Sequence, residues 1–179
     1  MISDMKFRPK STNMKGKRVF LLTLIFALAI FLISLVLPAY QGVVQMVSLA
    51  LLTVSLYYYN RYLATSYEYE ITTDYDGTPV FVVASYQKKR TSTLCRIALW
   101  DVTSVKRYKR EELAALPKDR EVAVFRYNPT LSPDFITVVS VRSTHEKSDL
   151  HLETSEDFDA YFLSLVEEAK GMRQTSQYE

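Results

Sequence analysis

The sequence is poor in the residue types from which enzyme and metal sites are most often built. Its 179 residues include one cysteine, two histidines and four glycines. The single cysteine, Cys95, cannot form an intrachain disulfide, which suits a reducing compartment, and we expect it to be a small buried side chain. His145 and His151 have no cysteine near them, whereas a zinc site needs three or four converging ligands. We therefore expect neither a metal nor a cofactor.

Sequence motifs for catalysis are missing as well. The chain has no G-x-S-x-G, H-E-x-x-H or C-x-x-C pattern and no glycine-rich loop that would cradle a phosphate. Asp74 and Asp76 stand before Gly77 as at the start of a calcium loop, but the remaining ligands do not follow. A hairpin turn explains these residues better. The sequence predicts a protein that is not an enzyme and has no catalytic residues.

Charge is absent from residues 19–59, which contain no Asp, Glu, Lys or Arg. The segments 19–37 and 42–59 each approach the roughly 20 residues that cross the hydrocarbon core of a bilayer. One helix over both would be roughly 60 Å long, about twice the core thickness. Pro38 ends a helix and Gly42 allows a tight turn, so the chain is expected to reverse there. We predict a transmembrane hairpin over residues 19–62, with helices of about 19–38 and 42–60.

A signal peptide and a soluble helical core are the alternatives to a transmembrane hairpin in this tract. A secretory signal peptide shares the basic start and apolar core, but here the apolar run is long and a second one follows at once. Two buried helices of a soluble protein would each carry a polar stripe, which neither segment shows. Uncharged polar residues such as Gln45 are expected to help the two helices pack together or to bind a partner helix, and the missing charges argue against an ion or proton path.

Charge at the flanks predicts the orientation. Residues 1–18 carry six basic residues against one acidic residue, and we expect a basic tail in the cytoplasm. A hairpin returns the chain to its starting side, so both termini are expected in the cytoplasm, in a multi-pass protein of the cell (inner or plasma) membrane. The residues expected to anchor the hairpin at the membrane–water interface are Tyr40, Tyr57, Tyr58, Tyr59, Arg61 and Tyr62.

Beyond residue 63 the apolar pattern changes to the alternation of β-strands. The stretch 109–120 interrupts it with helix-forming residues stopped by Pro117, which predicts one or two helical turns. Apolar residues spaced three and four apart then predict a C-terminal helix, capped by Thr154 or Ser155. We expect this helix to close at Lys170 and Gly171, followed by a disordered tail over 172–179. The expected strands are 67–71, 79–86, 93–100, 102–108, 121–128, 134–142 and 149–155.

This order of elements resembles a known family. After Arg96 the sequence follows the pattern I-x-L-x-D-V-x-x-V, at Ile97, Leu99, Asp101, Val102 and Val105. With the seven strands and the final helix, residues 67–170 resemble the pleckstrin-homology-like (PH-like) domains of bacterial membrane proteins, in which one or two spanning helices precede the β module. The resemblance implies an α+β protein: a transmembrane hairpin, then a cytosolic domain over 63–171. It also implies that this domain is a seven-stranded antiparallel PH-like barrel or sandwich capped by the C-terminal helix.

Two basic clusters follow expected strands. In an up-and-down meander, both would lie at the end of the domain that is tied to the second helix. There they would face anionic lipid, although ordinary solubilising charges are the alternative interpretation. Many eukaryotic PH domains bind phosphoinositides through a basic first hairpin loop; here that loop is acidic, so we do not expect such binding. The candidate contact residues are Lys88, Lys89, Arg90, Lys106, Arg107, Lys109 and Arg110.

The sequence therefore predicts a non-enzymatic integral membrane protein that displays a PH-like interaction module to another protein or to an anionic lipid surface. One alternative is an accessory or regulatory subunit of a larger membrane transporter or enzyme complex; another is a tethered cytosolic enzyme. Expected partners are membrane lipids and another membrane or cytosolic protein. Nucleic acid is not expected, because the excess of basic residues lies in the N-terminal segment and not on the folded domain. The oligomeric state stays open.

Overall fold

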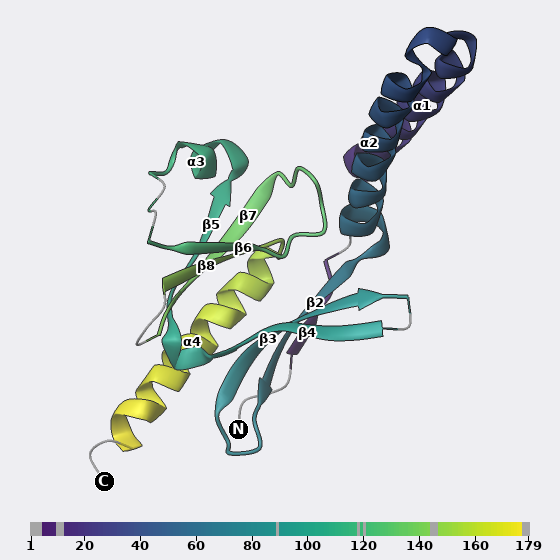
Figure 1. Ribbon diagram of the computed structural model, residues 1–179. Helices are drawn as coiled ribbons and strands as arrows, with labels where there is room; N and C mark the ends of the chain where they lie inside the picture. Colours follow the sequence, from purple (N-terminus) through teal and green to yellow (C-terminus); the bar gives the residue numbers. More distant parts are fainter. Residues whose placement is uncertain are drawn as a thin grey trace. The chain divides into compact units, whose positions relative to one another are not determined.

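The computed structural model describes residues 5–9, 13–88, 90–117, 119, 121–143 and 147–176. Residues 174–176 are described by their backbone only. Within them the chain forms two compact units (Figure 1). One is a helical hairpin together with the short segment Pro129–Ser132. The other is a β module of two four-stranded sheets with a C-terminal helix.

The helical hairpin contains the reversal that we expected at Pro38. Its elements are α1 (Met14–Val36), the 3-10 turn η1 (Pro38–Tyr40), α2 (Gln41–Tyr59) and the π-helical turn η2 (Asn60–Ala64). Asn13 caps α1, because its side-chain oxygen accepts a hydrogen bond from the Gly16 backbone N–H at 2.8 Å. The amide nitrogen of Asn13 donates to the backbone oxygens of Tyr62 and Pro129, both at 3.0 Å. One side chain thus ties together the start of α1, the turn η2 and the segment Pro129–Ser132.

Small side chains form the contact between the two helices. The Ser48 hydroxyl donates to the backbone oxygen of Ala27 at 2.8 Å, and the Ser55 hydroxyl donates to that of Phe20 at 3.3 Å. Ala27 and both serines are buried, while large apolar side chains point outward. In each helix, only 11% of the most apolar 18-residue stretch is buried. Both helices are long and apolar enough to cross a membrane, and their exposed faces suit lipid better than water.

Sheet A contains a strand that its sequence does not predict. The order of the sheet is β1-β2-β3-β4, made of β1 (Met5–Phe7), β2 (Ser66–Thr73), β3 (Pro79–Gln87) and β4 (Arg90–Ala98). Met5 pairs with Ile71 and Phe7 with Tyr69, antiparallel. We expected no strand in residues 1–18, because three residues are too few to show a period. The whole helical hairpin is therefore an insertion between two neighbouring strands of one sheet.

The turn between β2 and β3 is the hairpin turn predicted from Asp76-Gly77. The Asp74 N–H donates to the Thr78 oxygen at 2.8 Å, and Gly77 adopts a φ of 84°, which glycine reaches without steric cost.

Sheet B corrects the expected meander. After the short turn η3 (Leu99–Asp101), it consists of β5 (Val102–Lys109), β6 (Ala123–Arg126), β7 (Phe135–Arg142) and β8 (Lys147–Leu152), in the order β5-β7-β8-β6. β6 runs parallel to β8, so the prediction of seven antiparallel strands was wrong. All four β6 residues are exposed, as befits an edge strand, and the chain after β6 passes through Pro129–Ser132 before it returns beside β5. The short helix expected after β5 is α3 (Arg110–Ala115).

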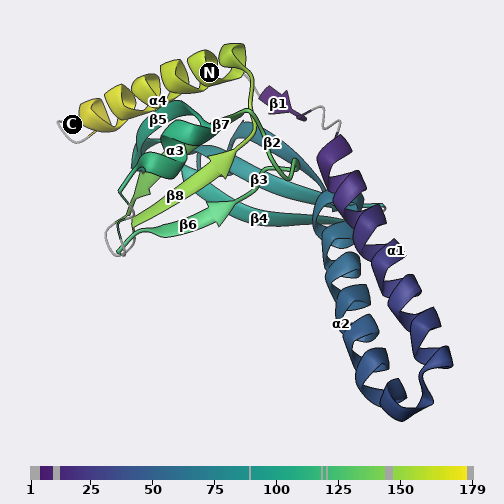
Figure 2. The ribbon, with the colours of Figure 1, turned by 90° about the horizontal axis from the view of Figure 1, so that it is seen from above.

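The C-terminal helix α4 (Glu156–Ser176) is confirmed and runs along one side of the two sheets (Figure 2). The Ser155 hydroxyl accepts a hydrogen bond from the Phe158 N–H at 3.2 Å, so the predicted cap is present. Phe158 and Phe162 are fully buried, with the Phe162 ring 4.7 Å from that of Phe81. Each such phenylalanine contributes roughly 2–3 kcal/mol of burial energy. The helix extends five residues past Gly171 into the segment that we expected to be disordered; residues 177–179 lie outside the described part.

A buried carboxylate fastens β1 to sheet A. Glu68 is 2% exposed and accepts hydrogen bonds from the Tyr86 hydroxyl at 2.9 Å and from Arg8, the residue after β1. Burial by itself would raise the pKa of Glu68, but the hydrogen bonds from Arg8 and Tyr86 outweigh it and lower the pKa below its ordinary value. Lys6 forms a more exposed pair with Glu70 at 2.9 Å. Phe7 adds an apolar contact, its ring 5.0 Å from Phe158.

Replacing a small residue in the helix contact is expected to weaken the hairpin. Ser48→Leu inserts extra carbon atoms where Ser48 meets Ala27, and overpacking of this kind costs about 1–3 kcal/mol. Thermal unfolding in detergent micelles should show a lower midpoint. Thr53→Leu is the matched control, because Thr53 is exposed and bonds only within its own helix. Equal midpoints for the two variants would contradict this packing.

Removing Arg8 is expected to destabilise the β module in a pH-dependent manner. In Arg8→Ala, the buried Glu68 carboxylate keeps only the Tyr86 hydroxyl. Because the folded-state pKa of Glu68 is lowered, the stability that Arg8 provides is fully present above the unfolded pKa of about 4.3. It is lost as the pH falls through the folded pKa. Thermal midpoints should therefore differ at neutral pH and converge in acid. Lys6→Ala, which disturbs only the exposed pair, should lower the midpoint far less; a pH-independent effect of Arg8→Ala would refute the assignment.

Candidate functional site: basic surfaces of the β module

The turn between β3 and β4 presents a strained lysine. Gln87 pairs with Arg90, so the chain reverses between these two residues, and Lys88 lies in the reversal. Lys88 has a φ of 54°, the left-handed region that glycine and asparagine adopt far more readily. A lysine there costs roughly 1 kcal/mol of backbone strain. Lys88 and Arg90 are exposed, while Lys89 lies outside the described residues. A cation thus occupies a position where turn geometry alone would favour another residue.

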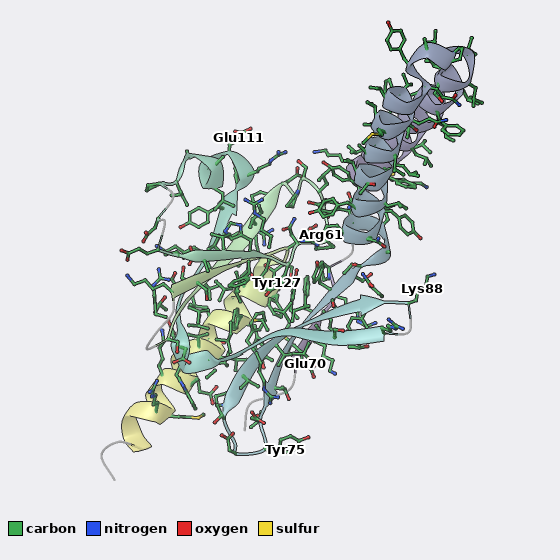
Figure 3. The ribbon with its side chains drawn as sticks, viewed as in Figure 1. Arg61, Glu70, Tyr75, Lys88, Glu111 and Tyr127 are labelled. Atoms are coloured by element: carbon green, nitrogen blue, oxygen red, sulfur yellow. The ribbon has the colours of Figure 1, made fainter. Side chains whose placement is uncertain are left out.

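This turn lies at a defined end of sheet A. β2 begins at Ser66, one residue after η2, and reverses at Asp74–Thr78 into β3. Gln87, at the far end of β3, is therefore at the same end of the sheet as Ser66. Figure 3 shows Lys88 and Tyr75 at opposite ends of sheet A. The basic turn is thus at the end where the chain arrives from the helical hairpin.

Lys109 and Arg110 lie at the corresponding end of sheet B. Lys109 pairs with Phe135, the first residue of β7, and the Arg110 N–H donates to the Asp134 oxygen at 3.3 Å. Asp134 follows closely after Pro129–Ser132, the segment that belongs to the hairpin unit. Lys109 and Arg110 are exposed. Two separate groups of cations, one in each sheet, therefore lie at sheet ends where a paired or neighbouring strand begins just after the hairpin unit.

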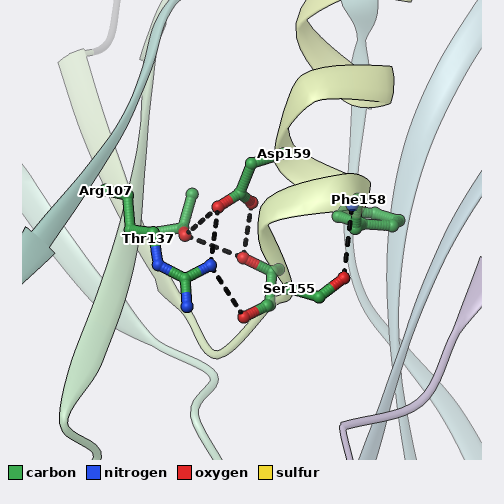
Figure 4. Close-up of polar contacts among 6 residues, drawn as sticks. Arg107, Thr137, Ser155, Phe158 and Asp159 are labelled. Atoms are coloured by element: carbon green, nitrogen blue, oxygen red, sulfur yellow. Dashed lines mark hydrogen bonds and ion pairs between the residues drawn. The ribbon is translucent and has the colours of Figure 1, made fainter.

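Arg107, which the sequence pattern groups with these cations, points into the module instead. Its guanidinium donates to the Asp159 carboxylate and to the Thr154 backbone oxygen, both at 3.3 Å, and lies over the Phe135 ring at 4.9 Å (Figure 4). Thr137 is buried and donates to the same Asp159 oxygen at 2.8 Å, while the Thr154 hydroxyl bonds the other oxygen. This cluster joins the first turn of α4 to sheet B, and its carboxylate is occupied by these contacts. We assign it a structural role.

The register of sheet B separates an inner row of side chains from an outer row. The inner row, which faces the core, consists of Val105, Val139, Leu150 and Phe125, of which Val139 and Leu150 are buried. Neighbouring residues of a strand point to opposite faces, so the next row points outward. This outer row, termed the basic row below, consists of Lys106, Val138, His151 and Arg126.

The basic row groups residues that sequence reasoning did not connect. Burial lowers the pKa of His151, and the nearby Arg126 charge lowers it further. Lys106 and Arg126 are exposed on the two outermost strands. Arg126 reaches this face only through the parallel pairing of β6 with β8, for which the sequence holds no local signal.

The expected interface residues cluster at the two ends of the hairpin. Tyr40 is 68% exposed in the turn η1. At the other end, the Tyr58 ring lies 5.9 Å from both Tyr57 and Tyr62, and Arg61 lies over the Tyr62 ring at 5.3 Å. Tyr59 contacts Phe20 of α1. Aromatic rings thus gather at the end of α2 that leads into sheet A.

No family model, curated protein or solved structure matches this chain. Among the described residues, no group of three or more His, Cys, Asp and Glu side chains is placed to hold a metal ion.

Breaking the cluster at the start of α4 is expected to destabilise the β module. Asp159→Ala leaves the Arg107 guanidinium and the Thr137 hydroxyl without their shared acceptor, which costs about 2–4 kcal/mol. Chemical denaturation should show a clearly lower midpoint. Asp157→Ala is the matched control, because Asp157 is an exposed acid in the same helical turn. Similar losses in both variants would mean that only charge near the helix N-terminus matters.

Proposed function

We propose that this chain is a non-enzymatic integral membrane protein that crosses the bilayer twice and holds its β module at the membrane surface. There the module contacts anionic lipid and a partner protein. The observation that carries the proposal is the insertion of the helical hairpin between β1 and β2. Both flanks of the hairpin return to one sheet.

This insertion favours two crossings over the alternatives. Strands β1 and β2 are hydrogen-bonded neighbours, which a bilayer core of about 30 Å between them would prevent, so a single crossing does not fit. Cleavage of α1 as a signal peptide would remove β1 from sheet A. A buried helical core in a soluble protein does not fit the outward-facing apolar side chains.

Charge at the hairpin's flanks supports a cytoplasmic module. Lys15, Lys17 and Arg18 stand at the start of α1, and Arg61 stands just after α2, at the same end of the hairpin. Positive residues near spanning helices favour the cytoplasmic side. Both termini and the β module are then cytoplasmic.

The basic turns are suited to an anionic leaflet. Lys88 and Arg90 in sheet A and Lys109 and Arg110 in sheet B lie at the sheet ends where a neighbouring strand begins just after the hairpin unit. Each basic residue near such a surface adds roughly 1 kcal/mol of attraction, which decays within a Debye length of about 8–10 Å. The strained backbone of Lys88 supports a role for its charge, because strain of this kind clusters at functional positions.

We further propose that the module is a variant of the PH-like fold. A four-stranded sheet followed by a second sheet and a C-terminal helix supports this, whereas the place of β6 at the far edge of sheet B departs from it. The first hairpin turn carries Asp74 and Asp76, so its chemistry does not suit phosphoinositides.

Charge reversal at the basic turn is expected to weaken lipid contact. The full-length protein carries Cys95→Ser, so that a donor dye can be attached at Ser92→Cys in β4, and is reconstituted in nanodiscs. Energy transfer is then measured from this donor to acceptor dyes on the lipid headgroups. Transfer should rise with anionic phosphatidylglycerol and fall with salt, and Lys88→Glu/Arg90→Glu should remove this lipid dependence. Lys147→Glu is the matched control. Lys147 lies opposite Arg142 in the β7–β8 strand register, at the other end of sheet B from Lys109.

Lys88→Asn separates charge from turn geometry. Asparagine tolerates the left-handed backbone, so this variant should be as stable as the wild type or more so, yet still lose part of the lipid response. A response that survives both substitutions would exclude the turn as a lipid contact.

A further inference from the structure

Helix α2 carries a second set of regularly spaced residues beside its contact with α1. Ser48 and Ser55 face α1, and their hydroxyls bond carbonyl oxygens of that helix. The second set is spaced alternately three and four residues apart, and none of its members is buried. This set, termed the heptad seam below, consists of Gly42, Gln45, Leu49, Leu52 and Leu56.

The composition of the heptad seam distinguishes it from the rest of the α2 surface. Three of the four leucines of α2 belong to the seam, whereas all four of its valines lie elsewhere. Alternate steps of three and four residues keep one face of a helix in contact with a neighbouring helix over several turns. A helix surrounded only by lipid needs no such period, because hydrocarbon suits any apolar side chain. The seam therefore has the pattern of a second helix contact.

Gln45 is the polar member of the heptad seam. Among the described residues its side-chain amide forms no hydrogen bond, in contrast to the hydroxyls of Ser48 and Ser55. Gln45 stands 12 residues before Tyr57, which at about 1.5 Å per residue is roughly 18 Å into a hydrocarbon core of about 30 Å. An amide without a hydrogen bond in hydrocarbon costs free energy. Gln45 therefore needs a bonding partner from another helix.

We propose, on the basis of the function proposed above, that the heptad seam pairs α2 with the α2 of a second copy of this chain, and that the two Gln45 side chains bond each other. A carboxamide has both donors and an acceptor, so two of them bond reciprocally. The charges at the hairpin's flanks give every copy the same orientation, so the two α2 helices run parallel. In a parallel symmetric pair, equal positions of the seam meet, and the two amides lie opposite each other.

The neighbours of Gln45 suit this pairing. Gly42 stands about one turn before Gln45, and among the described residues no atom lies within 4 Å of the point where a Cβ would be. Small residues of this kind let two helix backbones approach closely. Leu49, Leu52 and Leu56 supply apolar contact along the following turns. The single amide also fixes the register, because a slip of one helix along the other leaves both amides unbonded.

Disulfide crosslinking in native membranes tests the seam position by position. In a full-length chain with Cys95→Ser, single cysteines replace the residues of α2 one at a time, and the membranes are treated with a thiol oxidant. We expect covalent dimers at Leu49→Cys, Leu52→Cys and Leu56→Cys. At least tenfold less dimer is expected at Val47→Cys and Val54→Cys, because two residues turn a helix by about 200° and place these side chains on another face.

A measurement of affinity separates the amide from the leucines. Copies with Cys95→Ser are labelled at Ser92→Cys with donor or acceptor dye, and energy transfer between copies is followed in proteoliposomes at varied protein-to-lipid ratios. Gln45→Leu keeps the size of the side chain but not its hydrogen bond, and should weaken dimerisation about tenfold; Gln45→Asn should weaken it less. Thermal midpoints in detergent identify any variant that loses its fold.

Paired leucines supply the matched control for the apolar contact. Leu49→Ala/Leu56→Ala should weaken dimerisation, whereas Leu28→Ala/Leu35→Ala should leave it unchanged. Both pairs are exposed leucines seven residues apart: the seam pair is 64% and 51% exposed, and the α1 pair is 56% and 57% exposed.

Three results would overturn the proposal. The first is crosslinking that does not follow the spacing of the seam. The second is unchanged dimerisation in Gln45→Leu, which would mean that the amide only reaches water near Tyr40. The third is crosslinking of the seam to a different protein and not to a second copy. The same membranes are also washed with alkaline carbonate: a protein that stays in the membrane without a seam crosslink contradicts the dimer alone, whereas a protein that is released contradicts the proposed function as well.

Discussion

The antiparallel pairing of β1 with β2 is the constraint on which the rest of this architecture depends. Two strands can share hydrogen bonds only if the chain between them leaves and returns to the same place. Here that chain is the helical hairpin, so the pairing fixes both of its flanks to one sheet. The buried Glu68, with Arg8 and Tyr86, reinforces a pairing that is only three residues long. Both covalent connections between Phe7 and Ser66 and the hairpin therefore lead to the same sheet.

The two units are held together by different physical means. In the hairpin, Ser48, Ser55 and Ala27 allow the backbones to approach, and hydroxyl groups bond carbonyl oxygens of the other helix. This is the packing expected where the surroundings are as apolar as the side chains themselves. In the β module, by contrast, Phe81, Phe158 and Phe162 are fully buried, and removal of apolar surface from water supplies the stabilisation. The change from one kind of packing to the other occurs between Ala64 and Tyr67.

The sequence predicts those features that depend on composition or local period. The uncharged tract predicts the hairpin, Pro38 its reversal and Asp76-Gly77 the first β turn; the spacing of Phe158 and Phe162 predicts α4. Features that depend on long-range pairing escape such reasoning. β1 is too short to show alternation, and nothing in residues 123–126 specifies a parallel neighbour. For the same reason the sequence does not reveal the basic row, and it presents Arg107 as a surface charge although Asp159, far away in the chain, draws it inward.

The insertion of the hairpin also has a consequence for biogenesis. β1 leaves the ribosome before either helix, and β2 leaves it after both. In the proposed two-crossing topology, sheet A is therefore completed only when the inserted hairpin has returned the chain to its starting side. A misplaced hairpin would leave β1 on the opposite side of the membrane from β2. Glu68 and the edge of β2 would then lack their neighbours, and such a state is prone to proteolysis and aggregation. In this topology, the β module can fold completely only when the proposed membrane hairpin is correctly inserted.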